Sequence, residues 1–158
     1  MYGGVQGYMS VVNKNGIPCF PVSVHLLIIS QGKILMLRRY KTGYEDGKYS
    51  LVVGKLEQEE SVAKGMIREA EEEVGIKLTR LHVVHVMNRS GDDCNRIDYF
   101  FLADEWEGIP FNAECNKCDK VEWFDIKNLP TNTIPYIKCA ISHILNGEHF
   151  SIYGWTDT

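Results

Sequence analysis

The sequence lacks a long hydrophobic segment, because no apolar run in its 158 residues approaches the roughly 20 that a membrane-spanning helix needs. Residues 1–10 contain neither a basic stretch nor an apolar core, so they do not resemble a secretion signal. Repeats, low-complexity stretches and linkers are also missing. We therefore expect one cytoplasmic domain over residues 1–158 that does not bind membranes. Residues 1–20 are expected to form an N-terminal extension or an edge strand.

The sequence also lacks an excess of Lys and Arg residues. The chain has 17 Lys and Arg against 21 Asp and Glu, a formal net charge of −4, and residues 54–76 alone hold seven acids and three bases. Proteins that bind nucleic-acid backbones neutralise the phosphates with clustered Lys and Arg. Nucleic-acid polymers are therefore not expected as partners. An acidic site that binds an anion requires a cation between the two.

Cysteine is sparse and its count is odd. Five cysteines in a chain of this length do not form a disulfide framework, and reduced thiols suit a cytosolic protein. Cys115 and Cys118 form one C-x-x-C pair, but a structural zinc would need two more ligands. Zinc binding and redox chemistry are therefore the lesser alternatives for these residues.

The hydrophobic pattern predicts strands that surround two helices. The first two strands form a hairpin across the two-residue turn Gln31-Gly32. Helices are expected at 61–74 and 134–145, and the aromatic residues of the tail 148–158 can pack back onto the domain. The expected strands span 21–30, 33–38, 49–53, 78–88, 96–103 and 121–124. From these elements we predict an α/β fold in which one mixed sheet has helices on its faces.

The helix expected at 61–74 carries acidic residues in a pattern that opposes helix stability. At about 100° per residue, Glu69, Glu72 and Glu73 share roughly a 100° arc, whereas Glu71 faces water. Like charges three and four positions apart repel, and carboxylates late in a helix oppose its dipole. A solvated acidic face that Arg68 relieves is one interpretation of this pattern.

Two neighbouring features favour metal binding instead. Another acidic group, Glu57, Glu59 and Glu60, precedes the helix, and Gly54 allows that loop to fold over the same helix face. Carboxylate oxygens from several side chains are the ligands that Mg²⁺ or Mn²⁺ requires. A divalent ion is then the simplest relief of the repulsion. An acidic Ca²⁺-binding protein is a rival, although the chain lacks the D-x-[DN]-x-[DN]-G loop of that class.

The spacing of these residues resembles the signature of the Nudix (MutT-type) hydrolase family, G-x5-E-x7-R-E-U-x-E-E-x-G-U, where U is aliphatic. Flanking strands and the last helix resemble the family's whole domain over residues 21–145. The sequence departs from many relatives at Val52-Val53, where they have Pro-Gly, and at Glu59, where they have Gly. Every signature position is met, by Gly54, Glu60, Arg68, Glu69, Ala70, Glu72, Glu73, Gly75 and Ile76.

The resemblance implies an α/β/α sandwich with a loop–helix–loop motif. It also implies hydrolysis of a phosphoanhydride (pyrophosphate) bond in a nucleoside diphosphate linked to another group, such as a nucleoside triphosphate or related nucleotide, with Mg²⁺ or Mn²⁺. By position, the expected catalytic residues are Glu69, Glu72 and Arg68. The expected metal ligands are Glu69, Glu72, Glu73 and Glu57, and the residues that shape the motif are Gly54, Glu60 and Gly75.

Substrate contacts outside the motif are less specific. Arg38 and Arg39 lie at the end of a predicted strand, and Tyr40 follows them. These three residues are candidates for binding the nucleotide. The alternative is that they form a solvated strand end. Candidates for a base outside the motif are Glu114, Asp119 and Glu122, of which Glu114 is also expected to face the substrate. A small nucleotide is the expected partner, and a homodimer is left open. The alternative to an enzyme is a catalytically silent nucleotide-binding or regulatory module of the same fold.

Overall fold

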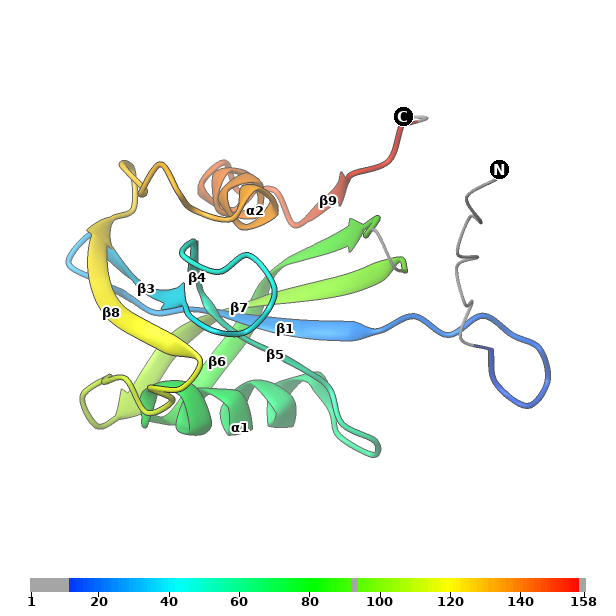
Figure 1. The fold of residues 1–158 in the computed structure, drawn as a ribbon, viewed down its shortest axis with the longest axis horizontal. Helices are drawn as coiled ribbons and strands as arrows, with labels where there is room; N and C mark the ends of the chain where they lie inside the picture. The colour runs from blue at the N-terminus through cyan, green and yellow to red at the C-terminus, as the bar shows by residue number, and fades with distance from the viewer. Residues whose placement is uncertain (1–11, 92–93, 157–158) are drawn as a thin grey trace.

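The computed structural model of the chain describes residues 12–91 and 94–156. Its two helices, α1 (Val62–Val74) and α2 (Pro135–Leu145), lie on opposite sides of the strands (Figure 1). This layered arrangement confirms the α/β/α sandwich that the sequence predicted. Among the described residues, no helix is both long and apolar enough to cross a membrane.

A mixed five-stranded sheet lies between the helices, in the order β5-β1-β7-β6-β9. Antiparallel pairing joins β5 to β1 and β7 to β6, and parallel pairing joins β1 to β7 and β6 to β9. The helices α1 and α2 lie on the two faces of this sheet (Figure 1). The strands are β1 (Val22–Leu27), β5 (Val52–Lys55), β6 (Lys77–Arg89), β7 (Arg96–Glu107) and β9 (Phe150–Tyr153).

A second sheet was not predicted. In it β3 (Lys33–Arg39) pairs antiparallel with β2 (Ile29–Ser30), β4 (Tyr49–Ser50) and β8 (Cys118–Asp125). The predicted hairpin turn is confirmed, because Ser30 pairs with Lys33. Its two turn residues, Gln31 and Gly32, have φ values of 50° and 75°, as two-residue hairpin turns require.

Two of the predicted strands are wrong in the same way, because each divides between the two sheets. Segment 21–30 breaks at Ile28, and segment 49–53 breaks at Leu51. Both residues are 1% exposed, so burial continues through each break. A continuous apolar run indicates burial but carries no signal for which sheet each half joins. The second segment also continues through Gly54, so the loop begins after Lys55 and not before it.

The remaining elements match their predictions with longer strands, and the C-terminal tail forms β9, which was not predicted. The expectation that this tail packs back is confirmed by its pairing with β6 and by Tyr153, which packs on the α2 side of the core. Phe150 and Trp155 stay exposed. Within residues 12–20 the structure has an isolated bridge between Val12 and Pro18 and no edge strand. Residues 1–11 lie outside the described ranges, and the boundary of the domain stays a prediction.

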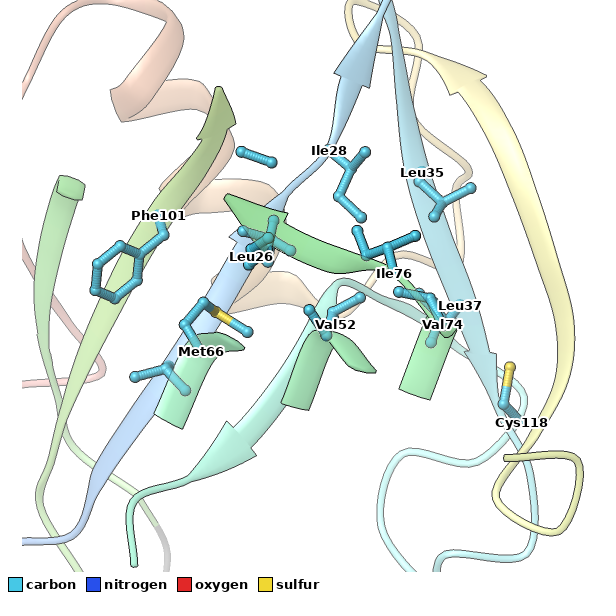
Figure 2. Close-up of a cluster of buried hydrophobic side chains, with 14 residues drawn as sticks. Leu26, Ile28, Leu35, Leu37, Val52, Met66, Val74, Ile76, Phe101 and Cys118 are labelled. Carbon is cyan, nitrogen blue, oxygen red and sulfur yellow. The ribbon is translucent and has the colours of Figure 1, made fainter. Parts of the chain in front are cut away.

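The hydrophobic core has two parts, one on each side of the large sheet. The part that packs against α1 includes Met66, Ala70 and Val74, which lie four positions apart on one side of the helix and are fully buried. Figure 2 shows Met66 and Val74 in this cluster. That spacing places all three on one helix face. Because this face is anchored in the core, the direction of the acidic face of α1 is fixed.

The ends of α1 are capped as the sequence predicted. The Ser61 hydroxyl accepts a hydrogen bond from the backbone N–H of Lys64 at 3.3 Å, which is typical of an N-cap. At the other end Gly75 adopts φ 66°, and its N–H donates to the carbonyl of Glu71 at 3.1 Å. These caps confine the helix to the residues that carry the acidic motif.

Candidate active site

A glycine brings β5 against the acidic face of α1. A Cβ atom on Gly54 would lie 1.8 Å from Cδ of Glu69, a separation that real structures do not tolerate. On the same strand, the N–H of Val53 donates to the Glu73 carboxylate at 3.2 Å. Strand and helix can approach this closely only because position 54 has no side chain.

Arg68 connects the carboxylates of the motif. Its Nε and Nη2 donate to the two oxygens of Glu60 at 2.9 and 3.0 Å, and Nη1 donates to Glu69 at 2.7 Å. Glu72 lies 3.6 Å from Nη1, and Nη2 also donates to the carbonyl of Lys55 at 3.2 Å. This planar fork orients two glutamates at once, a role that lysine cannot fill. Arg68 therefore contacts Glu60, Glu69 and Glu72 with one side chain.

The loop before the helix closes onto Arg68 through Glu60. The hydrogen bonds from Arg68 and, secondarily, from the N–H of Glu57 lower the pKa of Glu60 to about 2. The loop also needs space at the helix, since a Cβ on Gly65 would lie 2.5 Å from Cδ2 of Leu56. Glu60 therefore holds the loop in place, because it binds both Arg68 and the backbone of the loop at Glu57.

Two of the motif glutamates, Glu69 and Glu73, are partly buried, and Glu69 pairs with Arg68. Burial raises the pKa of Glu69, although the Arg68 hydrogen bond opposes the shift. Burial raises the pKa of Glu73 further, and the charge of Glu69 adds to the effect. By contrast, the Glu72 side chain is 53% exposed. Strongly perturbed carboxylates in a concave site are typical of functional sites.

The chemistry of these side chains suits a divalent cation better than their present spacing does. Within residues 12–91 and 94–156, no three His, Cys, Asp or Glu side chains stand close enough together to hold a metal ion as they are. Arg68 supplies the positive charge in this arrangement. The donor set nevertheless fits Mg²⁺ or Mn²⁺, because Glu69, Glu72 and Glu73 provide oxygen ligands from one helix face and two of them have their charged form disfavoured by burial. Binding a cation would offset that cost.

The loop between β7 and β8 caps α1 and returns to the site. The N–H groups of Phe111 and Ala113 donate to the carbonyls of Val74 and Glu73, each at 3.1 Å. The Phe111 ring lies where a Cβ on Gly75 would be, 2.1 Å from its Cε1. Gly75 is therefore needed both for its left-handed backbone and for this contact.

This loop carries Glu114 to the carboxylates of the helix, and its negative charge contributes to the raised pKa of both Glu69 and Glu73. The other two candidates for a base are committed elsewhere. Asp119 pairs with Arg38 at 2.6 Å, and Glu122 accepts a hydrogen bond from the hydroxyl of Tyr49. Glu114 is also paired, with Lys117 at 2.9 Å, but of the three candidates it alone lines the cavity that contains Glu69 and Glu73.

A cavity of about 490 Å³ unites the site. Tyr40 does not belong to its lining, and the Lys41 ammonium covers the Tyr40 ring at 4.9 Å. Sequence reasoning missed Lys117, which lines the cavity and pairs with Glu114 at 2.9 Å, since no motif spacing points to it. The predicted site residues in the lining are Arg38, Arg39, Gly54, Glu57, Arg68, Glu69, Glu72, Glu73 and Glu114.

This combination of fold and acidic cavity agrees with comparisons to known proteins. The family profile described as NUDIX domain matches residues 20–141. The chain belongs to the Nudix family. The 8-oxo-dGTP diphosphatase of Escherichia coli (strain K12) is 25% identical over 114 residues, which cover 72% of this chain and 86% of that relative.

Solved structures of Nudix proteins show the same fold. The crystal structure of MutT NUDIX hydrolase from Burkholderia pseudomallei superposes with a TM-score of 0.72 at 27% identity, covering 77% of this chain and 95% of that one. A bifunctional NMN adenylyltransferase/ADP ribose pyrophosphatase from Francisella tularensis, complexed with AMP and a Mn ion, matches with a TM-score of 0.62 at 25% identity, covering 81% of this chain and 42% of that one. The protein is therefore a Nudix hydrolase of the MutT type, which confirms the resemblance seen in the sequence.

Proposed function

We propose that this Nudix hydrolase uses Mg²⁺ or Mn²⁺ to cleave a phosphoanhydride bond in a nucleoside diphosphate linked to another group. A nucleoside triphosphate or a related nucleotide is the proposed substrate. The observation that carries the proposal is that Glu69, Glu72, Glu73 and Glu114 line one cavity. The names of the relatives, an 8-oxo-dGTP diphosphatase and an ADP ribose pyrophosphatase complexed with AMP and a Mn ion, support this substrate class and cofactor.

The proposed metal ligands are Glu69, Glu72 and Glu73, with Glu57 at the edge of the same cavity as a further ligand. A divalent ion bound there supplies positive charge to the phosphate oxygens and makes a water molecule more acidic. The free thiols of Cys19, Cys115, Cys118 and Cys139 fit a reducing compartment, and we propose the cytoplasm as the location.

The chain's own residues then perform three tasks. Arg68 holds Glu69 in position through the 2.7 Å hydrogen bond, so this carboxylate has a defined direction. Glu69 or Glu114 takes the proton from the attacking water, because both line the cavity and Glu69 has a raised pKa, which suits a general base. Arg39 and Lys117, in the same lining, offset the negative charge of the outer phosphates. No covalent nucleophile is required.

The experiment is a nucleotide panel assayed with Mg²⁺ and with Mn²⁺, with products separated by chromatography. Glu72→Gln and Glu73→Gln should leave folded proteins whose turnover falls by orders of magnitude. Glu71→Gln is the matched control, because Glu71 lies on the same helix and is exposed. Wild-type rates in either variant at saturating Mg²⁺ would refute these assignments. A wild-type protein that releases no product from any nucleotide would favour the catalytically silent module instead.

A further inference from the structure

A second cavity, of about 700 Å³, adjoins the carboxylate cavity. Pockets of roughly 300–1,000 Å³ accommodate small organic ligands. A nucleotide whose phosphates occupy the first cavity would therefore place the rest of the molecule in the second. The linings of the two cavities share Arg39, Thr42, Val53, Gly54 and Lys55.

The second cavity contains a buried ion pair that the proposed reaction does not use. Arg89, on β6, is part of its lining and donates to Asp98 on β7, from Nε at 2.6 Å and from Nη2 at 3.3 Å. The side chains are 11% and 0% exposed, respectively. Because the pair uses Nε and Nη2, the N–H groups of Nη1 lie outside it. The carboxylate balances the charge, so the pair presents hydrogen-bond donors with little net charge.

The plane of the Arg89 guanidinium is fixed by its surroundings. Its Cζ lies 3.9 Å from the centre of the Tyr136 ring, and the Tyr136 hydroxyl is hydrogen-bonded to Nε2 of His25 at 3.0 Å. The His25 ring in turn stacks on Phe100 at 4.4 Å. A donor held in this way loses little conformational entropy when a ligand binds, so it is suited to recognition.

We infer that Arg89 is a specificity-determining residue that donates hydrogen bonds to the base of the nucleotide and selects bases with a carbonyl edge. This inference rests on the proposed function. A guanidinium donates hydrogen bonds and accepts none, so the guanine edge with O6 and N7 or the uracil edge with O4 is favoured over the corresponding edges of adenine and cytosine, where an amino group replaces the carbonyl oxygen. A phosphate is a weaker match for Arg89, because Asp98 already neutralises the cation.

The test compares kcat/KM for GTP, UTP, ATP and CTP in the wild type and in two variants. Arg89→Lys keeps a positive charge beside Asp98 but loses the planar fork. Arg80→Lys is the matched control, since Arg80 lies on the same strand in an exposed pair with Glu105, outside the cavity. The wild type should prefer GTP and UTP, and Arg89→Lys should reduce this preference roughly tenfold or more. The control should keep the wild-type ratio.

The ratio separates recognition from structure, because a merely structural role of Arg89 lowers all four rates together. If Arg89→Lys does not fold, the double variant Arg89→Met/Asp98→Leu avoids an unpaired buried charge. A preference that stays unchanged in the Arg89 variants, or a wild type that prefers ATP and CTP or has no preference, overturns the inference. A second readout is calorimetric binding of GMP and AMP without metal. If the wild type hydrolyses no nucleotide, the proposed function fails, and the binding experiment then decides the role of Arg89. Tighter binding of GMP than of AMP supports that role, and equal or absent binding overturns it.

Discussion

Gly54 and Glu69 lie so close together that a Cβ atom on the glycine would overlap the carboxylate, 1.8 Å from its Cδ. Gly54→Ala must therefore displace Glu69, which also breaks its alignment with Arg68. We expect turnover to fall at least about tenfold, because misplacement of a catalytic group by about 1 Å is costly. Steady-state kinetics and thermal melting of the purified variant measure the two effects separately.

Gly147→Ala is the control for that variant. Gly147 has φ 75° and open space around it, so an alanine there strains the backbone without touching the site. It should cost about 1 kcal/mol of stability and leave turnover unchanged. Equal turnover in Gly54→Ala and the wild type would show that Glu69 does not need its present position.

Arg68→Lys should lower turnover by roughly tenfold or more, because an ammonium group cannot serve Glu60, Glu69 and the Lys55 carbonyl in one plane. The loop should also loosen, since the Glu57 N–H donates to Glu60 at 3.1 Å and Glu60 is held by Arg68. Hydrogen exchange at the Glu57 amide should therefore accelerate. Arg80→Lys is the control here too, and unchanged exchange at Glu57 in Arg68→Lys would disprove the link.

Acid should destabilise the protein through His25. Burial lowers the pKa of this histidine to about 4 from its ordinary value of 6.5. Between these pH values the unfolded chain binds a proton that the folded chain does not, so stability falls as pH falls from about 6.5 to about 4. The shift corresponds to about 3 kcal/mol.

Urea unfolding at pH 7.5 and pH 4.5 measures this effect. Carboxylates contribute to acid destabilisation in every variant, so the informative quantity is the difference from His25→Phe. That variant loses the hydrogen bond to Tyr136 at both pH values but has no histidine to protonate at this position. It should lose less stability between the two pH values than the wild type. Identical losses would contradict the assignment.

Local signals made part of this structure predictable. The spacing of Glu69, Glu72 and Glu73 on one helix depends only on the helical repeat, and Ser61 and Gly75 mark the helix ends by their own chemistry. The turn at Gln31-Gly32 is equally local. These features depend on no tertiary contact, so the acidic motif could be predicted from the sequence.

Tertiary contacts explain what could not be predicted. Glu114 was one of three candidate bases in the sequence, and the choice among them depends on the loop after β7, which hydrogen-bonds to the end of α1. Arg89 and Asp98 become partners only through the pairing of β6 with β7. The breaks at Ile28 and Leu51 depend on which sheet accepts each half of an apolar run. Apolar runs in a sequence indicate which residues are buried, but the pairing of distant strands decides which sheet each half of a run joins.

The proposed mechanism requires the carboxylates of α1 to bind divalent cations together with a nucleotide. Isothermal titration of the protein with Mg²⁺ and with Mn²⁺, alone and with a non-hydrolysable nucleotide analogue, measures this directly. We predict saturable uptake by the wild type and by Glu71→Gln, and much weaker uptake by Glu69→Gln and Glu73→Gln. If the wild type takes up no ion with or without the nucleotide, or if all four proteins bind equally, the proposed chemistry is contradicted.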